Sequence, residues 1–169
     1  PEAGVPDPDA ALAGARDILA ERASEDADVR AELRELLRTR GELRSTARRG
    51  KQDDPAAQKF RDWFDYAEPV RRAASHRILA LRRGESEDVL SVRVTMPESA
   101  AVAVLERRFL RGRGPASSQV ARALLDAWKR LLSVSLETEL RLELKQRADR
   151  EAIGVFTANL RELLLAAPL

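Results

Sequence analysis

Residues 116–167 form the longest stretch without proline, and this stretch constrains the fold most. Within 117–165, apolar residues recur every three or four positions, the period of an amphipathic helix. One stripe contains Val120, Leu124, Trp128 and Leu131 or Leu132. A second contains Leu136, Leu140, Leu144, Ala148, Ala152, Val155 or Phe156, Leu160, and Leu163 or Leu164. Ser133 and Ser135 separate the stripes, so a break there stays open. Unbroken, the helix would span roughly 70 Å, a length typical of helices that connect domains.

Shorter helices are predicted before this stretch. An Asp-Pro pair, which supplies a capping acceptor and a residue suited to the first turn, opens a helix at Asp7 and another at residue 54. A second helix is expected to begin at Ser24 and to end at Gly41, followed by a polar connector over 41–54. Further helices are predicted from Ser75, as cap, to Gly84, and over 98–110. Pro69 is expected to end a turn.

One segment has a period of two instead. Leu90, Val92 and Val94 alternate with polar residues, which predicts a half-buried strand. Its partner is either the weaker segment Leu43–Ala47 or a strand outside this chain. The predicted fold class is all-α: an irregular multihelical array with one long C-terminal helix and at most a short β-strand or hairpin around 89–95. We expect a helical region over 1–113 and a connecting helix over 114–169.

Composition limits the possible chemistry. The 169 residues include no cysteine, which excludes disulfides and thiolate metal sites and favours a reducing compartment. Neither a signal peptide nor an apolar run of about 18 residues is visible, so we expect a cytoplasmic protein without a membrane partner. The chain begins at Pro1 and its single methionine is Met96, so we expect a fragment or a processed form. No cofactor is predicted.

Charges are sorted into blocks although the net charge is only +2. Residues 1–37 are strongly acidic, residues 38–51 are basic, and residues 69–84 hold five arginines and no acid. Arginine suits bidentate contacts with phosphate or carboxylate. These cations either bind nucleic acid or a partner, or pair with the acidic first hairpin. The candidate nucleic-acid-binding residues are Arg71, Arg72, Arg77, Arg82, Arg83, Arg48, Arg49 and Lys51.

Other candidate groups have a stronger structural interpretation. Trp63, Phe64 and Tyr66 could stack on bases, but their helical spacing favours a core or interface role. His76 is the only histidine, and its neighbour Ser75 lies on a different side of a helix, so the two do not form a nucleophile–base pair. An enzyme using His76 or the Asp62/Asp65 pair is the weakest hypothesis. We therefore predict no catalytic residue and no metal site.

Two segments carry a family resemblance. Residues 59–84, KFRDWFDYAEPVRRAASHRILALRRG, and residues 135–165 are similar to the Tex family of bacterial transcription accessory proteins, which is related to a eukaryotic transcription elongation factor. The resemblance covers nearly the whole chain and is weakest over 44–53 and 98–115. It implies the helical region that precedes an RNase H-like domain, with helix-hairpin-helix motifs and a nucleic-acid-binding S1 domain lying outside this chain.

The resemblance and the basic blocks together predict a non-catalytic helical scaffold that binds RNA or DNA through a basic face. The alternative is a protein–protein docking module that contacts RNA polymerase, other transcription machinery or other domains of the same chain. In that case the interface would consist of Trp63, Phe64 and Tyr66 together with the strand Leu90–Val94. The resemblance transfers no catalytic residue to this chain.

Overall fold

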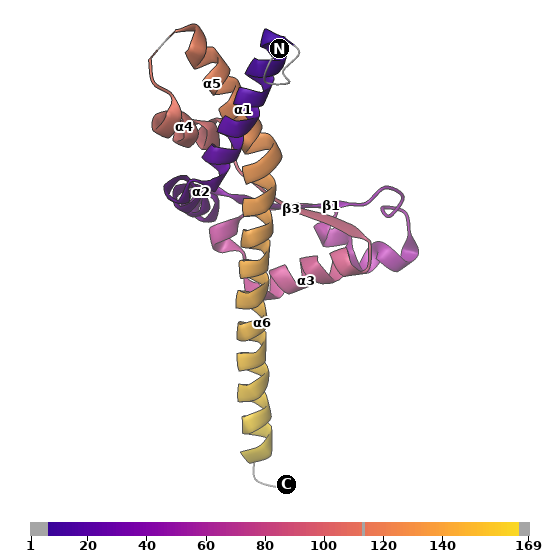
Figure 1. Ribbon diagram of the computed structural model, residues 1–169. Coiled ribbons are helices and arrows are strands. Elements are labelled where there is room, and N and C mark those ends of the chain that lie inside the picture. Colours follow the sequence, from indigo (N-terminus) through magenta and orange to yellow (C-terminus); the bar gives the residue numbers. More distant parts are fainter. Residues whose placement is uncertain (1–6, 113, 166–169) are drawn as a thin grey trace. The chain divides into compact units, whose positions relative to one another are not determined.

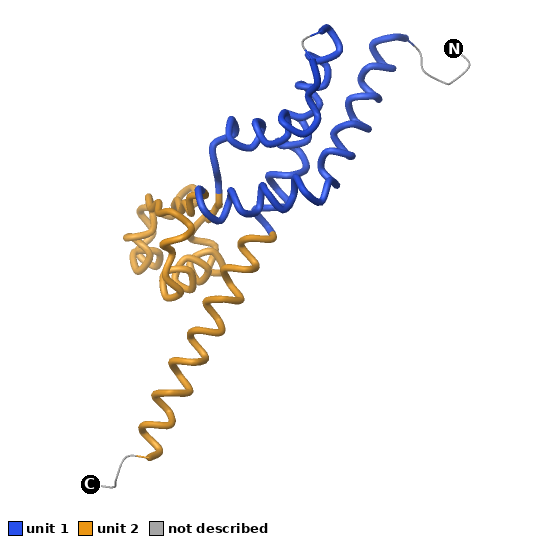
Figure 2. Tube along the Cα trace, turned by 90° about the vertical axis from the view of Figure 1, so that its left-hand side faces the viewer, with its two compact units in different colours: residues 1–40, 95–138 blue, residues 41–94, 139–169 orange. Residues whose placement is uncertain are grey.

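A computed structural model describes residues 7–112 and 114–165 of the chain. The residues form two compact units, Pro1–Arg40 with Thr95–Thr138 (unit 1) and Gly41–Val94 with Glu139–Leu169 (unit 2), which Figure 2 colours separately. Most residues are helical, which confirms the predominantly α-helical fold class (Figure 1). The described residues also form a three-stranded sheet, so the β-structure exceeds the single strand or hairpin expected around 89–95.

Unit 1 is entirely helical apart from its connections. It contains α1 (Pro8–Glu25), α2 (Ala27–Arg40), α4 (Glu98–Phe109), α5 (Pro115–Asp126), the π-helical stretch η3 (Ala127–Leu132) and the first residues of α6 (Ser133–Leu165). Helix α1 packs against α5 and η3, and α2 packs against α4. Leu33, Leu105, Leu124 and Leu132 are fully buried in this unit.

The ends of the first two helices follow from their caps. The Asp7 side chain accepts a hydrogen bond from the Ala10 N–H at 2.7 Å, which confirms the predicted start of α1. The predicted start of the second helix at Ser24 is wrong. The Ser24 hydroxyl donates to the Glu21 carbonyl inside α1, and Asp26 caps α2 by accepting from the Val29 N–H at 3.0 Å. Aspartate thus supplies both caps.

Unit 2 is built around the small sheet. It contains β1 (Glu42–Ala47), η1 (Pro55–Trp63), β2 (Asp65–Pro69), η2 (Val70–Arg72), α3 (Ser75–Ser86), β3 (Leu90–Thr95) and most of α6. The strand order is β2-β1-β3, and β1 runs antiparallel to β2 with Leu43 opposite Glu68. This confirms Leu43–Ala47 as a partner segment of the predicted strand.

Two predicted connections are strands instead. Residues 42–47 were expected in a polar connector and residues 65–69 in a turn. In β1, Leu43 and Ser45 are buried whereas Arg44 and Thr46 are exposed. A half-buried strand needs an inward side chain only at alternate positions, and in β1 one of these is a serine. The apolar pattern is therefore weak, which is why the sequence predicts Leu43–Ala47 only as one of two possible partners and otherwise as part of the connector.

Helix α3 begins and ends differently from the prediction. Its first residue is Ser75, whose hydroxyl donates to the Glu151 carboxylate of α6, so Ser75 is not a cap. Gly84 does not stop the helix, which continues to Ser86. The glycine is buried against the side chains of Leu90 and Phe60, and a Cβ there would lie 2.8 Å from Leu90 Cγ. A glycine is needed at position 84 because Leu90 and Phe60 pack closely against the helix there, and not because the helix ends.

Helical structure runs without a gap from Pro115 to Leu165 through α5, η3 and α6. The break considered at Ser133 and Ser135 does not occur. The π-helical stretch η3 ends at Leu132, and α6 begins directly after it at Ser133. The apolar stripe of α6 divides in two: Leu136, Leu140, Leu144 and Ala148 are buried, whereas every residue from Glu151 to Leu165 is exposed. Among the described residues, no helix is both long and apolar enough to cross a membrane.

Gly84→Ala should lower the free energy of unfolding by about 1–2 kcal/mol, because overpacking against buried Leu90 costs more than the helix gains from alanine. The matched control is Gly14→Ala in α1, where no atom lies within 4 Å of an added Cβ. It should raise stability by up to about 1 kcal/mol. Urea denaturation followed by circular dichroism measures both. Equal stabilisation by the two substitutions would contradict the packing role of Gly84.

Candidate nucleic-acid interface

All eight predicted nucleic-acid-binding residues lie in unit 2, but they do not form one patch. Arg71, Arg72 and Arg77 lie in η2 and the first turn of α3, whereas Arg48 contacts residues just beyond the C-terminus of α3. A helix of the length of α3 spans about 18 Å. The structure therefore places Arg71, Arg72 and Arg77 at one end of α3 and Arg48, Arg49 and Lys51 at the other, while Arg82 and Arg83 belong to the helix itself.

The first cluster, at the N-terminal end of α3, contains cations of two kinds. Arg71 and Arg72 are exposed, and neither makes an ion pair among the described residues. Arg77 instead binds Glu68 of β2 through two hydrogen bonds of 3.1 and 2.9 Å. Glu68 is only 9% exposed, so this bidentate pair neutralises a buried carboxylate. Arg77 is thus a structural residue, and Arg71 and Arg72 remain available to a ligand.

The Glu68–Arg77 pair also affects Tyr66. Burial of the Tyr66 ring, followed by its hydrogen bond with Glu68, raises the pKa of the phenol above its usual value. The hydrogen bond with Glu68 likewise raises the pKa of Arg77. Both groups therefore keep their protons throughout the physiological range. This network holds β2 against the first turn of α3.

Helix α6 adds cations that the sequence analysis missed. Arg147 donates to the Ala73 carbonyl at 2.6 Å, directly between η2 and α3, which brings this part of α6 to the first cluster. Arg150, three residues further on, is exposed and makes no ion pair among the described residues. The sequence could not predict that residue 150 lies near residues 71–72, because only the contact between α6 and Ala73 in the folded chain brings these residues together.

The second cluster lies at the C-terminal end of α3 and is largely neutralised. Arg48 pairs with Asp88 at 3.1 Å and donates to the Leu90 carbonyl, and Lys51 pairs with Asp54 at 2.9 Å. Arg49 is exposed and has no ion pair among the described residues. Only one of the three predicted cations in this loop is therefore unpaired.

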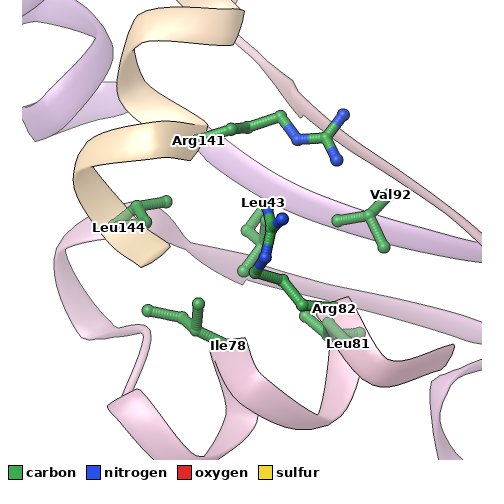
Figure 3. A pocket seen from close by; sticks show the side chains of 7 residues that line it. All are labelled: Leu43, Ile78, Leu81, Arg82, Val92, Arg141 and Leu144. Atoms are coloured by element: carbon green, nitrogen blue, oxygen red, sulfur yellow. The ribbon is translucent and has the colours of Figure 1, made fainter. Parts of the chain in front are cut away.

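Arg82 and Arg83 point to different sides of α3 although they are adjacent. Arg82 lines a small cavity with Arg141 and five apolar side chains from α3, α6, β1 and β3 (Figure 3). The cavity measures about 20 Å³, room for about one water molecule. One guanidinium nitrogen of Arg141 donates to both carboxylate oxygens of Glu85, at 2.6 and 2.5 Å. Arg82 is thus half-buried beside a small, mostly apolar pocket, whereas Arg83 is exposed on another side of the helix.

The three predicted interface residues are all half-buried. The Trp63 and Tyr66 rings meet edge to face, with centroids 4.8 Å apart and an interplanar angle of 74°. Trp63 also lines an open hollow between η1 and α3, with Phe60, Leu79, Ala80 and two cations, Lys59 and Arg83. Lys59 was not among the predicted site residues. Its position four residues before Trp63 is the signal that could have identified it.

The acidic first hairpin has ion-pair partners within unit 1. Arg107 pairs with Glu32, Arg108 pairs with Asp26 and Asp28, and Arg130 pairs with Asp17. The Arg108 pair helps to lower the pKa of Asp26, for which the hydrogen bond from the Val29 N–H is the larger cause. The arginines of α4 and η3 thus satisfy carboxylates of this hairpin.

The residues considered for catalysis lie on the surface. His76, Asp62 and Asp65 are all exposed. Among residues 7–112 and 114–165, no group of three or more histidine, aspartate and glutamate side chains is arranged to hold a metal ion. Described features that could receive a ligand or partner include the unpaired arginines, the hollow beside Trp63 and the exposed apolar residues at the end of α6.

Comparison with known proteins gives consistent matches. The family model described as "Tex central region-like" matches residues 1–156. The chain is 44% identical to "Protein tex" of Bordetella pertussis, over 99% of this chain and 23% of that protein. It is 38% identical to "Transcriptional accessory protein Tex" of Neisseria gonorrhoeae, over 97% of this chain and 22% of that protein. A human "S1 RNA-binding domain-containing protein 1" is 28% identical, over 92% of this chain and 17% of that protein. The chain thus spans less than a quarter of the length of these relatives.

Arg77→Ala should lower the thermal midpoint of the chain by several degrees, because it leaves the buried Glu68 carboxylate without its bidentate partner. Arg71→Ala, which removes the same charge from an exposed position, should leave the midpoint unchanged. Differential scanning calorimetry of both variants measures the contrast. Equal midpoints for the two would contradict the structural assignment of Arg77.

Proposed function

The chain belongs to the Tex family, and from this membership we propose that it is a non-catalytic helical scaffold that binds nucleic acid through the first cluster of unit 2. The carrying observation is that Arg71, Arg72 and Arg150 are exposed and have no ion pair among the described residues. Exposed arginines without an ion pair also occur elsewhere among the described residues, Arg61 and Arg122 for example. What distinguishes Arg71, Arg72 and Arg150 is that they lie on either side of the contact between Arg147 and Ala73, and a group of unpaired cations favours an anionic ligand. We expect the protein to act in the cytoplasm with the transcription machinery.

The proposed ligand is RNA or DNA. One relative is named a transcriptional accessory protein, and another is named for an S1 RNA-binding domain. Because those proteins are several times longer than this chain, their names support a nucleic-acid-related role without locating it in these residues. Three unpaired arginines would neutralise only a few phosphates, so binding by this chain should be weak and strongly dependent on salt.

A second candidate function is docking onto RNA polymerase or another domain of the full-length protein. It is favoured by the exposed end of α6, where Ile153, Phe156, Leu160 and Leu163 recur at helical spacing, with Phe156 67% exposed. Such a stripe suits a protein surface better than a phosphate backbone. Protection of residues 153–165 from hydrogen exchange by RNA polymerase, but not by an oligonucleotide, is the result that would favour docking.

The proposal predicts salt-dependent binding of a fluorescein-labelled single-stranded RNA, measured by fluorescence anisotropy at several salt concentrations. The double substitution Arg71→Ala with Arg72→Ala should weaken binding and reduce the slope of log K against log salt by about 1.4, since each phosphate contact to a single strand contributes about 0.7. Binding that is absent even at low salt would overturn direct contact.

The matched control is Arg107→Ala with Arg108→Ala. These two adjacent arginines lie in α4 of unit 1 and form ion pairs with Glu32, Asp26 and Asp28. Their substitution removes the same charge as the substitution of Arg71 and Arg72. It should leave the salt slope unchanged. An equal loss of slope in both double variants would mean that net charge, rather than the first cluster, determines binding.

A further inference from the structure

The hollow between η1 and α3 has the composition of a base-binding site. Its walls are the Phe60, Trp63, Leu79 and Ala80 side chains, and two cations, Lys59 and Arg83, complete the lining without any carboxylate. Its volume of about 390 Å³ falls in the range of small-ligand sites. An aromatic wall beside cations is the combination that single-stranded nucleic acids require, because bases stack and phosphates need neutralisation.

The geometry of the two helices, η1 and α3, explains why these side chains line the hollow. In a 3₁₀-helix, residues three apart lie above one another, so Phe60 and Trp63 of η1 share a side. Phe60 is buried and anchors η1, whereas Trp63 stays half-exposed. On α3, Leu79, Ala80 and Arg83 share a side by their spacing of three and four residues. Their side therefore faces the hollow, and the side with Ile78 and Arg82 lines the small apolar pocket.

The cations of the hollow are held in place by one carboxylate outside its lining. Glu87 pairs with both Lys59 and Arg83, the latter at 2.9 Å. Hydrogen bonds from Lys59 and then Arg83 lower the pKa of Glu87, so it stays ionised at neutral pH. The Lys59 ammonium also lies 5.2 Å from the centroid of the Phe60 ring. Because Lys59 and Arg83 share the single negative charge of Glu87, these three groups together carry a net positive charge beside the hollow.

We infer that this hollow binds a base of a single-stranded nucleic acid, with the base stacked on Trp63 and the adjacent phosphate on Lys59 and Arg83. The inference rests on the proposed function and extends it, since it adds a base contact to the phosphate contacts of the first cluster. The hollow and the first cluster lie along the same helix, because Arg77 is in the first turn of α3 and Leu79, Ala80 and Arg83 of that helix line the hollow. A single strand lying along α3 would meet both.

The test compares octauridylate with an abasic ribose-phosphate oligomer of equal length, which keeps the phosphates and lacks the bases. Binding is measured by anisotropy for the parent chain, Trp63→Ala and Trp63→Phe. Trp63→Ala should weaken octauridylate binding about tenfold. Trp63→Phe, which retains an aromatic face, should change it less than about threefold, and neither should affect the abasic oligomer. Trp63 fluorescence, obtained as the difference between the parent chain and Trp63→Phe, should be quenched by octauridylate alone.

The outcomes separate the two proposals. Equal binding of both oligomers by the parent chain, with no change of Trp63 fluorescence, would overturn base binding and leave phosphate binding by the first cluster intact. Absence of binding by either oligomer would overturn both proposals and leave the hollow to a protein partner. The fluorescence arm uses the parent chain, so a folding defect in Trp63→Ala would not remove the test.

Discussion

The pairing of β1 with strands on both of its sides is the constraint on which unit 2 depends. Because β1 lies between β2 and β3, residues 42–47 join the segments 65–69 and 90–95 in one sheet. Buried Leu43 and Val92 then face α3 and α6 around one small cavity. The hollow is lined by η1 and α3, and the first cluster lies where η2 meets the first turn of α3, so both lie along one helix.

Ion pairing reduces the positive charge that this arginine-rich chain can offer to a ligand. Arg77 forms an ion pair with buried Glu68, Arg141 forms one with Glu85, and Arg48 forms one with Asp88. The exposed ion pairs contribute little stability, but each reduces the charge available to a phosphate. Unpaired Arg71, Arg72 and Arg150 are therefore more informative than the total number of arginines, and the small net charge of the chain conceals them.

Much of the helical fold could be predicted from the sequence, because capping aspartates and apolar stripes act locally. Asp7, Asp54 and the stripe beginning at Leu136 gave correct elements. The errors arose where tertiary contacts decide: β1 has a serine at an inward position, Gly84 is required by Leu90, and Ser75 binds Glu151 instead of capping. The candidate site was predicted by residue type only. Its division into two clusters, and the parts played by Arg150 and Lys59, depend on contacts between distant segments.

The central claim is that single-stranded nucleic acid contacts unit 2 along α3. Hydrogen–deuterium exchange of the chain with and without a single-stranded RNA tests it most directly, because it localises protection to peptides. We predict that protection is confined to residues 59–63, 71–83 and the part of α6 around Arg150. Protection confined to residues 153–165, or to the helices of unit 1, would contradict the claim.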